Sequence, residues 1–257
     1  VFSLGTLGYL LTGTPGSAAS ILGVASSVGH QISQSIAPLE LVTIYGIGIG
    51  PPAALIGRPD SNGVIGDSLG GYQVLFNGAP APLLYASSSQ INLIVPASIA
   101  NSTSTSIQIV KPEGTLAVPP FSVVPWLPVI FSDISNSAAP ALNQDGTLNS
   151  PANPAAAGSI VAIWLTGIGS ATGADNMINI PAPRQSNLPV RILGQDGMGR
   201  DDVPEQVLYA GDAPEQPSGV SQINFRLPPK RSGSPAYEKF FVSVGAVVSD
   251  VFYIWVK

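Results

Sequence analysis

One pentapeptide of the sequence matches a catalytic pattern. Gly66-Asp67-Ser68-Leu69-Gly70 fits the G-x-S-x-G arrangement in which a serine attacks an ester or amide carbonyl. That chemistry needs a histidine base held by a carboxylate, and the only histidine of the chain, His30, lies upstream of the serine. The residues that follow, Tyr72–Phe76, have strand character, whereas a nucleophile elbow leads into a helix. We therefore interpret residues 66–70 as a glycine-rich turn before a strand, and we expect the chain not to be an enzyme.

Metal and cofactor sites find little support in the residue types. The chain has no cysteine, and one histidine cannot build a zinc site. The segment Asn143–Asn149 and the residues Asp196, Asp201 and Asp202 offer oxygen ligands of the kind that calcium uses, but neither set matches an EF-hand loop. Asp-Gly is also a common turn dipeptide. We expect no metal and no cofactor, with calcium as the alternative.

Composition narrows the class of protein. Of the 257 residues, 45% are hydrophobic, and only 10% are charged, against roughly 25% in an average soluble domain. The net charge of −5 comes without a basic cluster, so the sequence predicts no nucleic-acid partner. No apolar run reaches the length of about 20 residues that a membrane-spanning helix needs. A sparsely charged surface is typical of a protein that neighbours cover or that works outside the cell, and we expect an extracellular or cell-surface location.

Short strands separated by turns dominate the sequence. The chain has 28 glycines and 25 prolines, which fall between short runs rich in Val, Ile, Phe and Tyr. No segment shows a sustained helical period, although a short helix is conceivable within residues 18–35. The pattern predicts an all-β protein. The expected strands are Leu41–Tyr45, Tyr72–Phe76, Ile91–Val95, Ser106–Val110, Phe121–Val124, Ile160–Leu165, Val190–Leu193, Gln222–Leu227, Phe240–Val244 and Val251–Val256.

An internal repeat sets the expected domain organisation. Leu41–Gly50 aligns with Ile160–Gly169 at five identical positions, and a Leu-Tyr-Ala followed by a Ser-Gln-Ile-Asn occurs later in each half. Two copies of one β-sandwich explain this order most simply. We predict two tandem immunoglobulin-like β-sandwich domains, at residues 18–124 and 125–257, preceded by an extension strand at residues 1–17.

The same motifs resemble a known family, the Solibacter (acidobacterial) uncharacterised C-terminal domain. The resemblance covers about Ile21 to Lys257 and implies an exported tandem of immunoglobulin-like domains, with no catalytic residues and no defined ligand. The motifs that carry it are Ile36-Ala37-Pro38, Leu41–Gly50, Asn77–Tyr85, Ser89–Asn92, Ser150–Ala155, Thr166–Gly169 and Ser221–Asn224.

The first thirteen residues, Val1–Gly13, are apolar and carry no charge. An exposed tail of this kind would promote aggregation, so we expect another strand to cover it. The segment would add as an extra strand to its own first domain, or to a neighbouring subunit, which would generate a filament by head-to-tail repetition. The predicted subunit contacts are Phe2, Leu4, Leu7, Tyr9, Leu10 and Leu11.

Two hypotheses for function follow. The leading one is a structural extracellular protein that self-associates into a cell-surface filament by strand addition. The alternative is a secreted binding or adhesion module for glycans or surface proteins, with exposed aromatic and polar groups in the loops Ile56–Gly70 or Gly194–Gly219. Asn101 begins an Asn-Ser-Thr glycosylation sequence, which we interpret as part of a solvated hairpin.

Overall fold

The computed structural model describes residues 19–28, 34–133, 137–169, 175–179, 181, 184–194, 203–229 and 236–257. The prediction of an all-β protein is confirmed, because these residues form strands and one short 3-10 helix, Ala97–Asn101. The strands are β1 (Ser20–Ser26), β2 (Ser35–Ile36), β3 (Leu41–Ile47), β4 (Leu55–Ile56), β5 (Gln73–Phe76), β6 (Ala79–Pro80), β7 (Leu83–Ala86), β8 (Gln90–Ile94), β9 (Ser104–Lys111), β10 (Gly114–Val123), β11 (Val129–Ile130), β12 (Ile160–Thr166), β13 (Arg184–Gln185), β14 (Val190–Gly194), β15 (Val203–Glu205), β16 (Val207–Asp212), β17 (Ser221–Arg226), β18 (Ala236–Val244), β19 (Val247–Val248) and β20 (Phe252–Val256).

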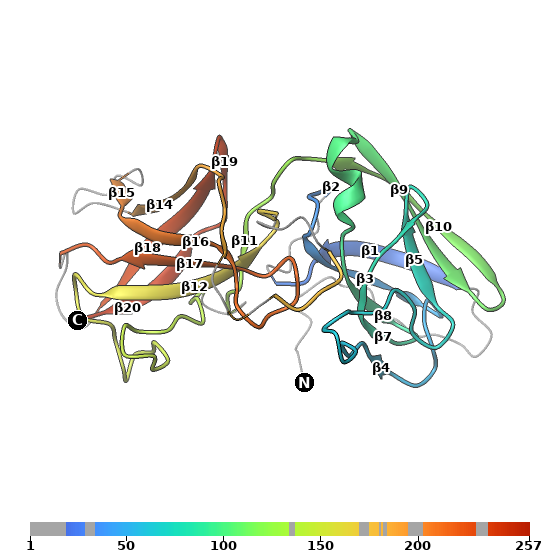
Figure 1. The fold of residues 1–257 in the computed structure, drawn as a ribbon, viewed down its shortest axis with the longest axis horizontal. Helices are drawn as coiled ribbons and strands as arrows, with labels where there is room; N and C mark the ends of the chain where they lie inside the picture. The colour runs from blue at the N-terminus through green and yellow to red at the C-terminus, as the bar shows by residue number, and fades with distance from the viewer. Residues whose placement is uncertain are drawn as a thin grey trace.

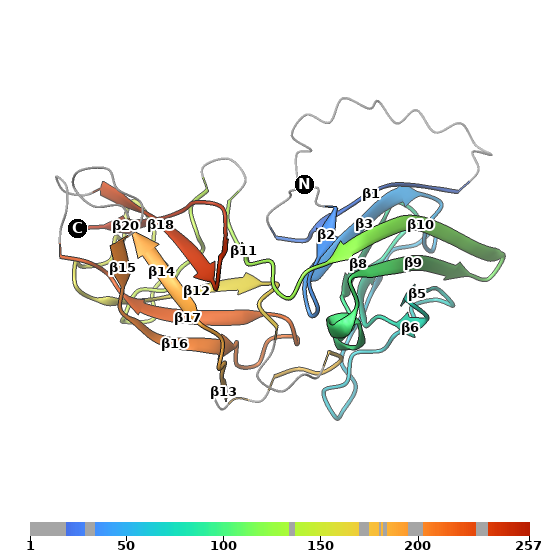
Figure 2. The same ribbon diagram turned by 90° about the horizontal axis from the view of Figure 1, so that it is seen from above.

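The strands form two units that lie side by side (Figures 1 and 2). In the N-terminal unit, the sheet β1-β3-β8-β7-β4 packs on the sheet β2-β10-β9-β5-β6, and side chains of both sheets share one apolar core. In the C-terminal unit, the sheet β11-β12-β17-β16-β13 packs on β15-β14-β18-β19, with β20 also paired to β18. Each unit is therefore a two-sheet sandwich. That each belongs to the immunoglobulin-like class stays a prediction.

Alternation of residue types explains why these segments are strands. In β9, Thr105, Ile107 and Ile109 point into the core, whereas Ser104, Ser106 and Gln108 are exposed, which is the period of two that a half-buried strand requires. Asn77 and Gly78 connect β5 to β6 with φ angles of 48° and 84°, as a tight hairpin turn demands. The turn and the alternation together determine which face of β5 and β6 is buried.

The internal repeat occupies equivalent places in the two units. The first repeat element forms β3 and β12, and the Ser-Gln-Ile-Asn element forms β8 and β17, which pair with them in antiparallel fashion. Tyr85 lies opposite Asn92 and Tyr209 lies opposite Asn224, each directly after a bulge. On the outer face, the Gln90 amide donates to Asn92 Oδ1 at 2.7 Å, and Gln222 does the same to Asn224 at 2.8 Å. The same Gln–Asn side-chain hydrogen bond therefore occurs on the outer face of the equivalent strand in each unit, β8 and β17.

The short helix considered within residues 18–35 is wrong for the part of that range that the structure describes. Residues 20–26 form β1, which pairs antiparallel with β3. Val24 and Ala25 enter the core, while Ser20 and Leu22 are exposed. The segment takes the strand conformation because it can hydrogen-bond to the edge of β3, a tertiary contact that local propensity does not register.

Three kinds of contact join the two units. The Leu41 backbone N–H donates to Thr166 Oγ1 at 2.8 Å. The segment 63–65 pairs with residues 176–178 through Ile65 N–H to Asn176 O (2.7 Å) and Ile178 N–H to Gly63 O (2.8 Å). Leu41 also joins a small apolar cluster with Ala213 and Val220. Both the start of β3 and the segment 63–65 of the N-terminal unit therefore contact the C-terminal unit.

Candidate functional site

The serine of the hydrolase-like pentapeptide lies directly before a tight turn. The Leu69 and Tyr72 backbones exchange two hydrogen bonds of 3.0 Å, and Gly70 and Gly71 between them have φ angles of 60° and 85°. The strand β5 follows directly, so the predicted turn before a strand is confirmed. Ser68 itself is exposed. His30 lies outside the described residues.

The segment proposed as a calcium alternative forms a self-bonded loop. Asp145 Oδ1 accepts hydrogen bonds from the Thr147 hydroxyl (2.6 Å) and the Thr147 backbone N–H (3.0 Å), and these bonds lower the pKa of the Asp145 carboxyl. Asn143 Oδ1 accepts from the Asn149 amide at 2.9 Å. In the ranges that the structure describes, no three His, Asp or Glu side chains come together. The residues Asp196, Asp201 and Asp202 lie outside those ranges.

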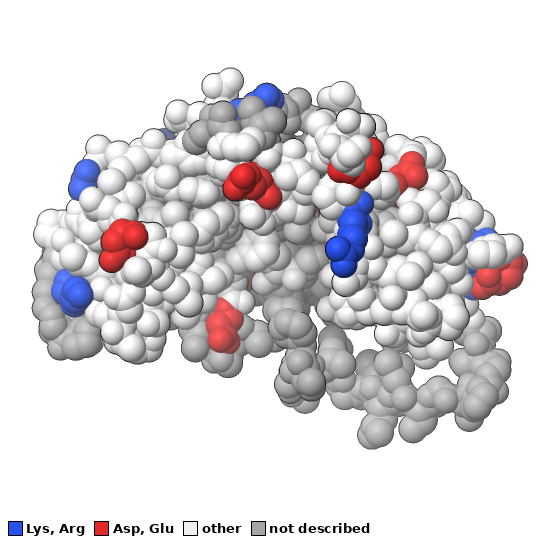
Figure 3. Space-filling model, turned by 60° about the horizontal axis from the view of Figure 1, so that its bottom comes forward, with Lys and Arg blue, Asp and Glu red and all other residues white. Residues whose placement is uncertain are grey.

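The other sequence predictions fall on exposed or undescribed residues. Asn101 is exposed at the end of the 3-10 helix. The predicted subunit contacts, Phe2, Leu4, Leu7, Tyr9, Leu10 and Leu11, lie outside the described residues, as does all of Val1–Gly13. No helix in the described part of the chain is long and apolar enough to cross a lipid bilayer. Charged side chains are few and scattered over the face shown in Figure 3.

Aromatic side chains gather on the outer face of the β18–β20 ribbon. Tyr237 of β18 is 54% exposed, and its ring meets those of Tyr253 and Trp255 of β20 edge to face, with centroid distances of 4.9 and 5.0 Å. Farther along β18, the Lys239 ammonium lies 5.1 Å from the centre of the Phe241 ring. We call Tyr237, Tyr253 and Trp255 the aromatic face.

Strand alternation creates this face. In β20, Phe252, Ile254 and Val256 fill the core, so Tyr253 and Trp255 must point outward. In β18, Phe240 and Val242 are buried, which places Tyr237 on the outside as well. Tyr237 lies directly opposite Trp255 in the ladder. The two strands therefore bring aromatic rings together from positions 18 residues apart.

The backbone of β20 is held on both edges. One edge pairs with β18. On the other edge, Asn149 bonds to Trp255 as a strand would, with Nδ2 to Trp255 O at 2.8 Å and Trp255 N–H to Oδ1 at 2.9 Å. Farther along, Lys257 N–H donates to Ala155 O at 2.8 Å. Because the Trp255 amide and carbonyl point away from β18, Tyr237 and Trp255 form a non-hydrogen-bonded pair, in which side chains lie closest.

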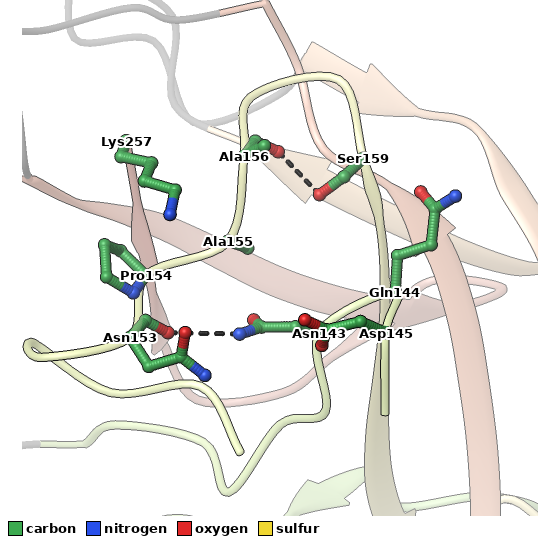
Figure 4. A pocket seen from close by; sticks show the side chains of 9 residues that line it. All are labelled: Asn143, Gln144, Asp145, Asn153, Pro154, Ala155, Ala156, Ser159 and Lys257. Atoms are coloured by element: carbon green, nitrogen blue, oxygen red, sulfur yellow. Dashed lines mark hydrogen bonds between the residues drawn. The ribbon is translucent and has the colours of Figure 1, made fainter. Parts of the chain in front are cut away.

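A polar pocket of about 450 Å³ lies beside the end of β20 (Figure 4). Lys257 lines it, two residues after Trp255 and directly after the last residue of β20. The other lining residues come from the loops before β12: Asn143, Gln144, Asp145, Asn153, Pro154, Ala155, Ala156 and Ser159. A second hollow of about 300 Å³ shares Asn143 and Gln144 and reaches Gln222 and Asn224.

The sequence indicated part of this site. Alternation along the last strand shows that Tyr253 and Trp255 share a face, but Tyr237 and Lys257 were not singled out, and Asn149 was named only as part of the calcium-ligand segment Asn143–Asn149. The aromatic face lies on a sheet, outside the loops Ile56–Gly70 and Gly194–Gly219, and a binding cluster in those loops stays a prediction. The pairing of β18 with β20 could have been suspected from the matching aromatic alternation of Tyr237 and Phe241.

Comparisons with known proteins identify no family. No protein-family model and no curated protein matches the chain. Among solved structures, the chain is similar to the surface glycan-binding protein PbSGBP-B from Prevotella bryantii, with 14% identity over 92% of this chain and a TM-score of 0.27. It is also similar to the BSP domain of a biofilm-associated protein, with 10% identity over 87% of the chain and a TM-score of 0.25.

The chain spans 41% and 28% of the lengths of these two proteins. TM-scores below 0.5 do not establish a shared fold, and what those proteins bind is not transferred to this chain. The resemblance to the Solibacter C-terminal domain family likewise stays a prediction.

Proposed function

We propose that the chain is a non-catalytic extracellular module that binds carbohydrate through the aromatic face. The single observation that carries this proposal is the group of three rings, Tyr237, Tyr253 and Trp255, on the outside of a sheet whose other face is core. A sugar ring has an apolar face of C–H groups, which packs on an aromatic side chain, and hydroxyl groups, which bind to polar neighbours. The three rings offer the apolar surface, and the Tyr hydroxyl and Trp N–H groups of the same side chains offer polar partners for sugar hydroxyls.

The aromatic face is held in place by bonds on both edges of β20, which supports a binding role. The backbone of Trp255 is held by Asn149 on one side and by β18 on the other, so the rings lose little conformational entropy when a ligand arrives. Tyr and Trp also combine a large apolar surface with one polar group, which suits a ligand that is apolar on one face and polar at its rim. Cross-strand aromatic contacts also stabilise a sheet, so binding and stability must be measured separately.

Replacing Trp255 by Ala is expected to weaken carbohydrate binding at least tenfold, the equivalent of about 1.4 kcal/mol. The measurement is titration calorimetry against the glycans that a glycan array selects for the unmodified protein. Tyr45→Ala is the control, because Tyr45 is a half-buried aromatic on the outer side of β3, in the other unit. An array without hits, or equal binding by the Trp255 and Tyr45 variants, would contradict the proposal.

Ser68 is expected not to react with a fluorophosphonate probe. Ser68 is exposed, but it directly precedes a two-glycine hairpin turn that leads into β5, whereas a catalytic serine of this pattern lies at a strand-to-helix elbow. Labelling is measured by mass spectrometry on the intact protein, with Ser68→Ala as the control. Labelling of the unmodified chain that disappears in Ser68→Ala would show that the chain is an enzyme after all.

Filament formation by strand addition is a second candidate, and one edge of the fold favours it. The sheet β1-β3-β8-β7-β4 ends at β1, whose outer edge pairs with no other described strand. By contrast, Pro119 and Pro120 interrupt the pairing of β10, a common way to protect an edge. The apolar segment Val1–Gly13 would be the donated strand. Electron microscopy of the chain with and without residues 1–13 tests this, since unchanged assembly after truncation would exclude strand donation.

A further inference from the structure

The aromatic face and the polar pocket lie along the same strand. Tyr253 and Trp255 alternate on one side of β20, and Lys257, which directly follows the strand and bonds through its backbone to Ala155 and Ala157, lines the pocket. At about 3.3 Å per residue, the distance from Tyr253 to Lys257 is about 13 Å. A ligand that covers Tyr253 as well as Trp255 and also reaches the pocket must span this distance, which exceeds one sugar ring, so it must contain more than one sugar.

Hydrogen bonds hold the pocket side chains in place before any ligand arrives. The Asn153 amide donates to Thr147 Oγ1 (2.8 Å) and to the Leu148 carbonyl (3.0 Å). The Asn143 amide donates to the Asn153 carbonyl at 3.1 Å. Gln144 Oε1 accepts from the Ile160 backbone N–H at 3.0 Å. Side chains that are already oriented bind a ligand at a lower entropic cost.

These bonds leave specific polar groups for a ligand. Within the described part of the chain, Gln144 Nε2, Asn153 Oδ1 and Lys257 Nζ make no hydrogen bond to protein, and all three residues line the pocket. Two of these groups donate and one accepts. Sugar hydroxyls, which both donate and accept, match such a mixture.

The charge of the pocket favours an uncharged ligand. The Thr147 hydroxyl and backbone N–H lower the pKa of Asp145, with a smaller contribution from Lys257, so this carboxylate is ionised at neutral pH. Asp145 offsets the one cation of the pocket, and the chain as a whole carries a net charge of −5. The carboxylate of a uronic acid would meet Asp145 as well as Lys257 and would gain no net attraction there.

We infer that the pocket is a second subsite of the aromatic face, and that the ligand is a neutral, linear oligosaccharide lying along β20. One sugar stacks on Trp255, and the next binds through its hydroxyl groups to Gln144, Asn153 and Lys257. This inference rests on the proposed carbohydrate-binding function, which requires only the aromatic face.

The test is the dependence of affinity on ligand length. The probes are the methyl β-glycosides of glucose and mannose and the neutral β-linked gluco- and manno-oligosaccharides from disaccharide to hexasaccharide, with galacturonate oligosaccharides of the same lengths. The affinity of the unmodified protein should rise with length in a neutral series. Lys257→Ala and Gln144→Glu should each lower affinity for the disaccharide and the longer sugars about tenfold, as expected for one lost hydrogen bond, and leave the affinity for the methyl monosaccharides, which reach only Trp255, unchanged.

Both variants preserve the fold of the pocket. Gln144→Glu keeps the oxygen that accepts from Ile160 N–H, and Lys257 contributes only its backbone to the bonds with Ala155 and Ala157. Lys111→Ala is the matched control, because it removes a lysine that pairs with Glu113 in the other unit.

The outcomes separate this inference from the proposed function. If affinity still rises with ligand length in both pocket variants, while Trp255→Ala abolishes binding, the pocket is not a subsite and the aromatic face alone is the binding site. Tighter binding of galacturonates than of neutral oligosaccharides of the same length would show that the ligand is not neutral. Absence of binding to every saccharide would refute the proposed function itself.

Discussion

The free energy of unfolding is expected to fall by about 3 kcal/mol as the pH rises from 4.5 to above 7, because of Glu40 alone. Glu40 lies in the turn between β2 and β3 and is only 1% exposed. Burial raises the pKa of its carboxyl from 4.5 to about 7, and the Ala37 backbone N–H (3.0 Å from Oε2) and the nearby Ser26 hydroxyl lower it by less. The protonated acid is therefore the form that the folded protein prefers.

The direction of the effect follows from the two protonation states. Below pH 4.5 the carboxyl is protonated in both the folded and the unfolded chain, so it causes no loss of stability. Between pH 4.5 and about 7 the unfolded chain releases the proton and the folded chain keeps it, and stability declines steadily. Above pH 7 the folded chain holds a buried carboxylate, and the loss is complete.

Denaturant unfolding across this pH range measures the effect. Glu40→Gln should flatten the decline, because the amide oxygen can still accept from Ala37 and the side chain no longer ionises. Glu113→Gln is the control, since Glu113 is an exposed carboxylate whose pKa its Lys111 partner lowers, which confines its own effect to more acidic solutions. A decline that persists unchanged in Glu40→Gln would show that Glu40 is ionised in the folded protein.

Substituting Gly219 by Ala is expected to lower the free energy of unfolding by at least about 2 to 3 kcal/mol and to weaken the contact between the two units. Gly219 has a φ of 88°, which disfavours any side chain. A Cβ there would also overlap the Leu39 carbonyl oxygen and lie 3.1 Å from the Leu41 side chain. Both neighbours belong to the other unit, so relief requires the two units to separate.

Gly158→Ala separates the clash from the backbone strain. Gly158 has a similar φ of 76°, and a Cβ there meets no atom within 4 Å. Gly158→Ala should lower the free energy of unfolding by about 1 kcal/mol, because it introduces only the strain of a positive φ at an alanine. Thermal unfolding and small-angle X-ray scattering of both variants provide the comparison. Equal destabilisation, with no change in scattering profile, would show that the Gly219 contact does not hold the units together.

Glu40 and Gly219 belong to the same part of the molecule. Leu39 and Leu41, on either side of Glu40, are the residues that approach Gly219, and Leu41 N–H bonds to Thr166 of the other unit. The buried acid is thus next to the inter-unit contact in sequence. The pH-dependent loss of stability at Glu40 therefore arises close to the junction between the two units.

Local sequence determined the strands. Each of the ten expected strands overlaps a strand of the structure, because alternation of apolar and polar residues and the turns that bound them are properties of neighbouring residues. The repeat also placed β3 and β12, and β8 and β17, in equivalent pairs. The helix considered within residues 18–35 was wrong where it can be compared, because β1 owes its conformation to β3.

Only the tertiary structure decided which surfaces meet. Alternation puts Tyr253 and Trp255 on one face, but it does not say that Tyr237 pairs beside them or that Asn149 holds the Trp255 backbone across 106 residues of chain. The burial of Glu40 and the approach of Gly219 to Leu39 are equally invisible in the sequence, since both depend on how the two sandwiches dock. Residue patterns encode which side of a strand is apolar, whereas the partner of each side is set by packing between segments far apart in the chain.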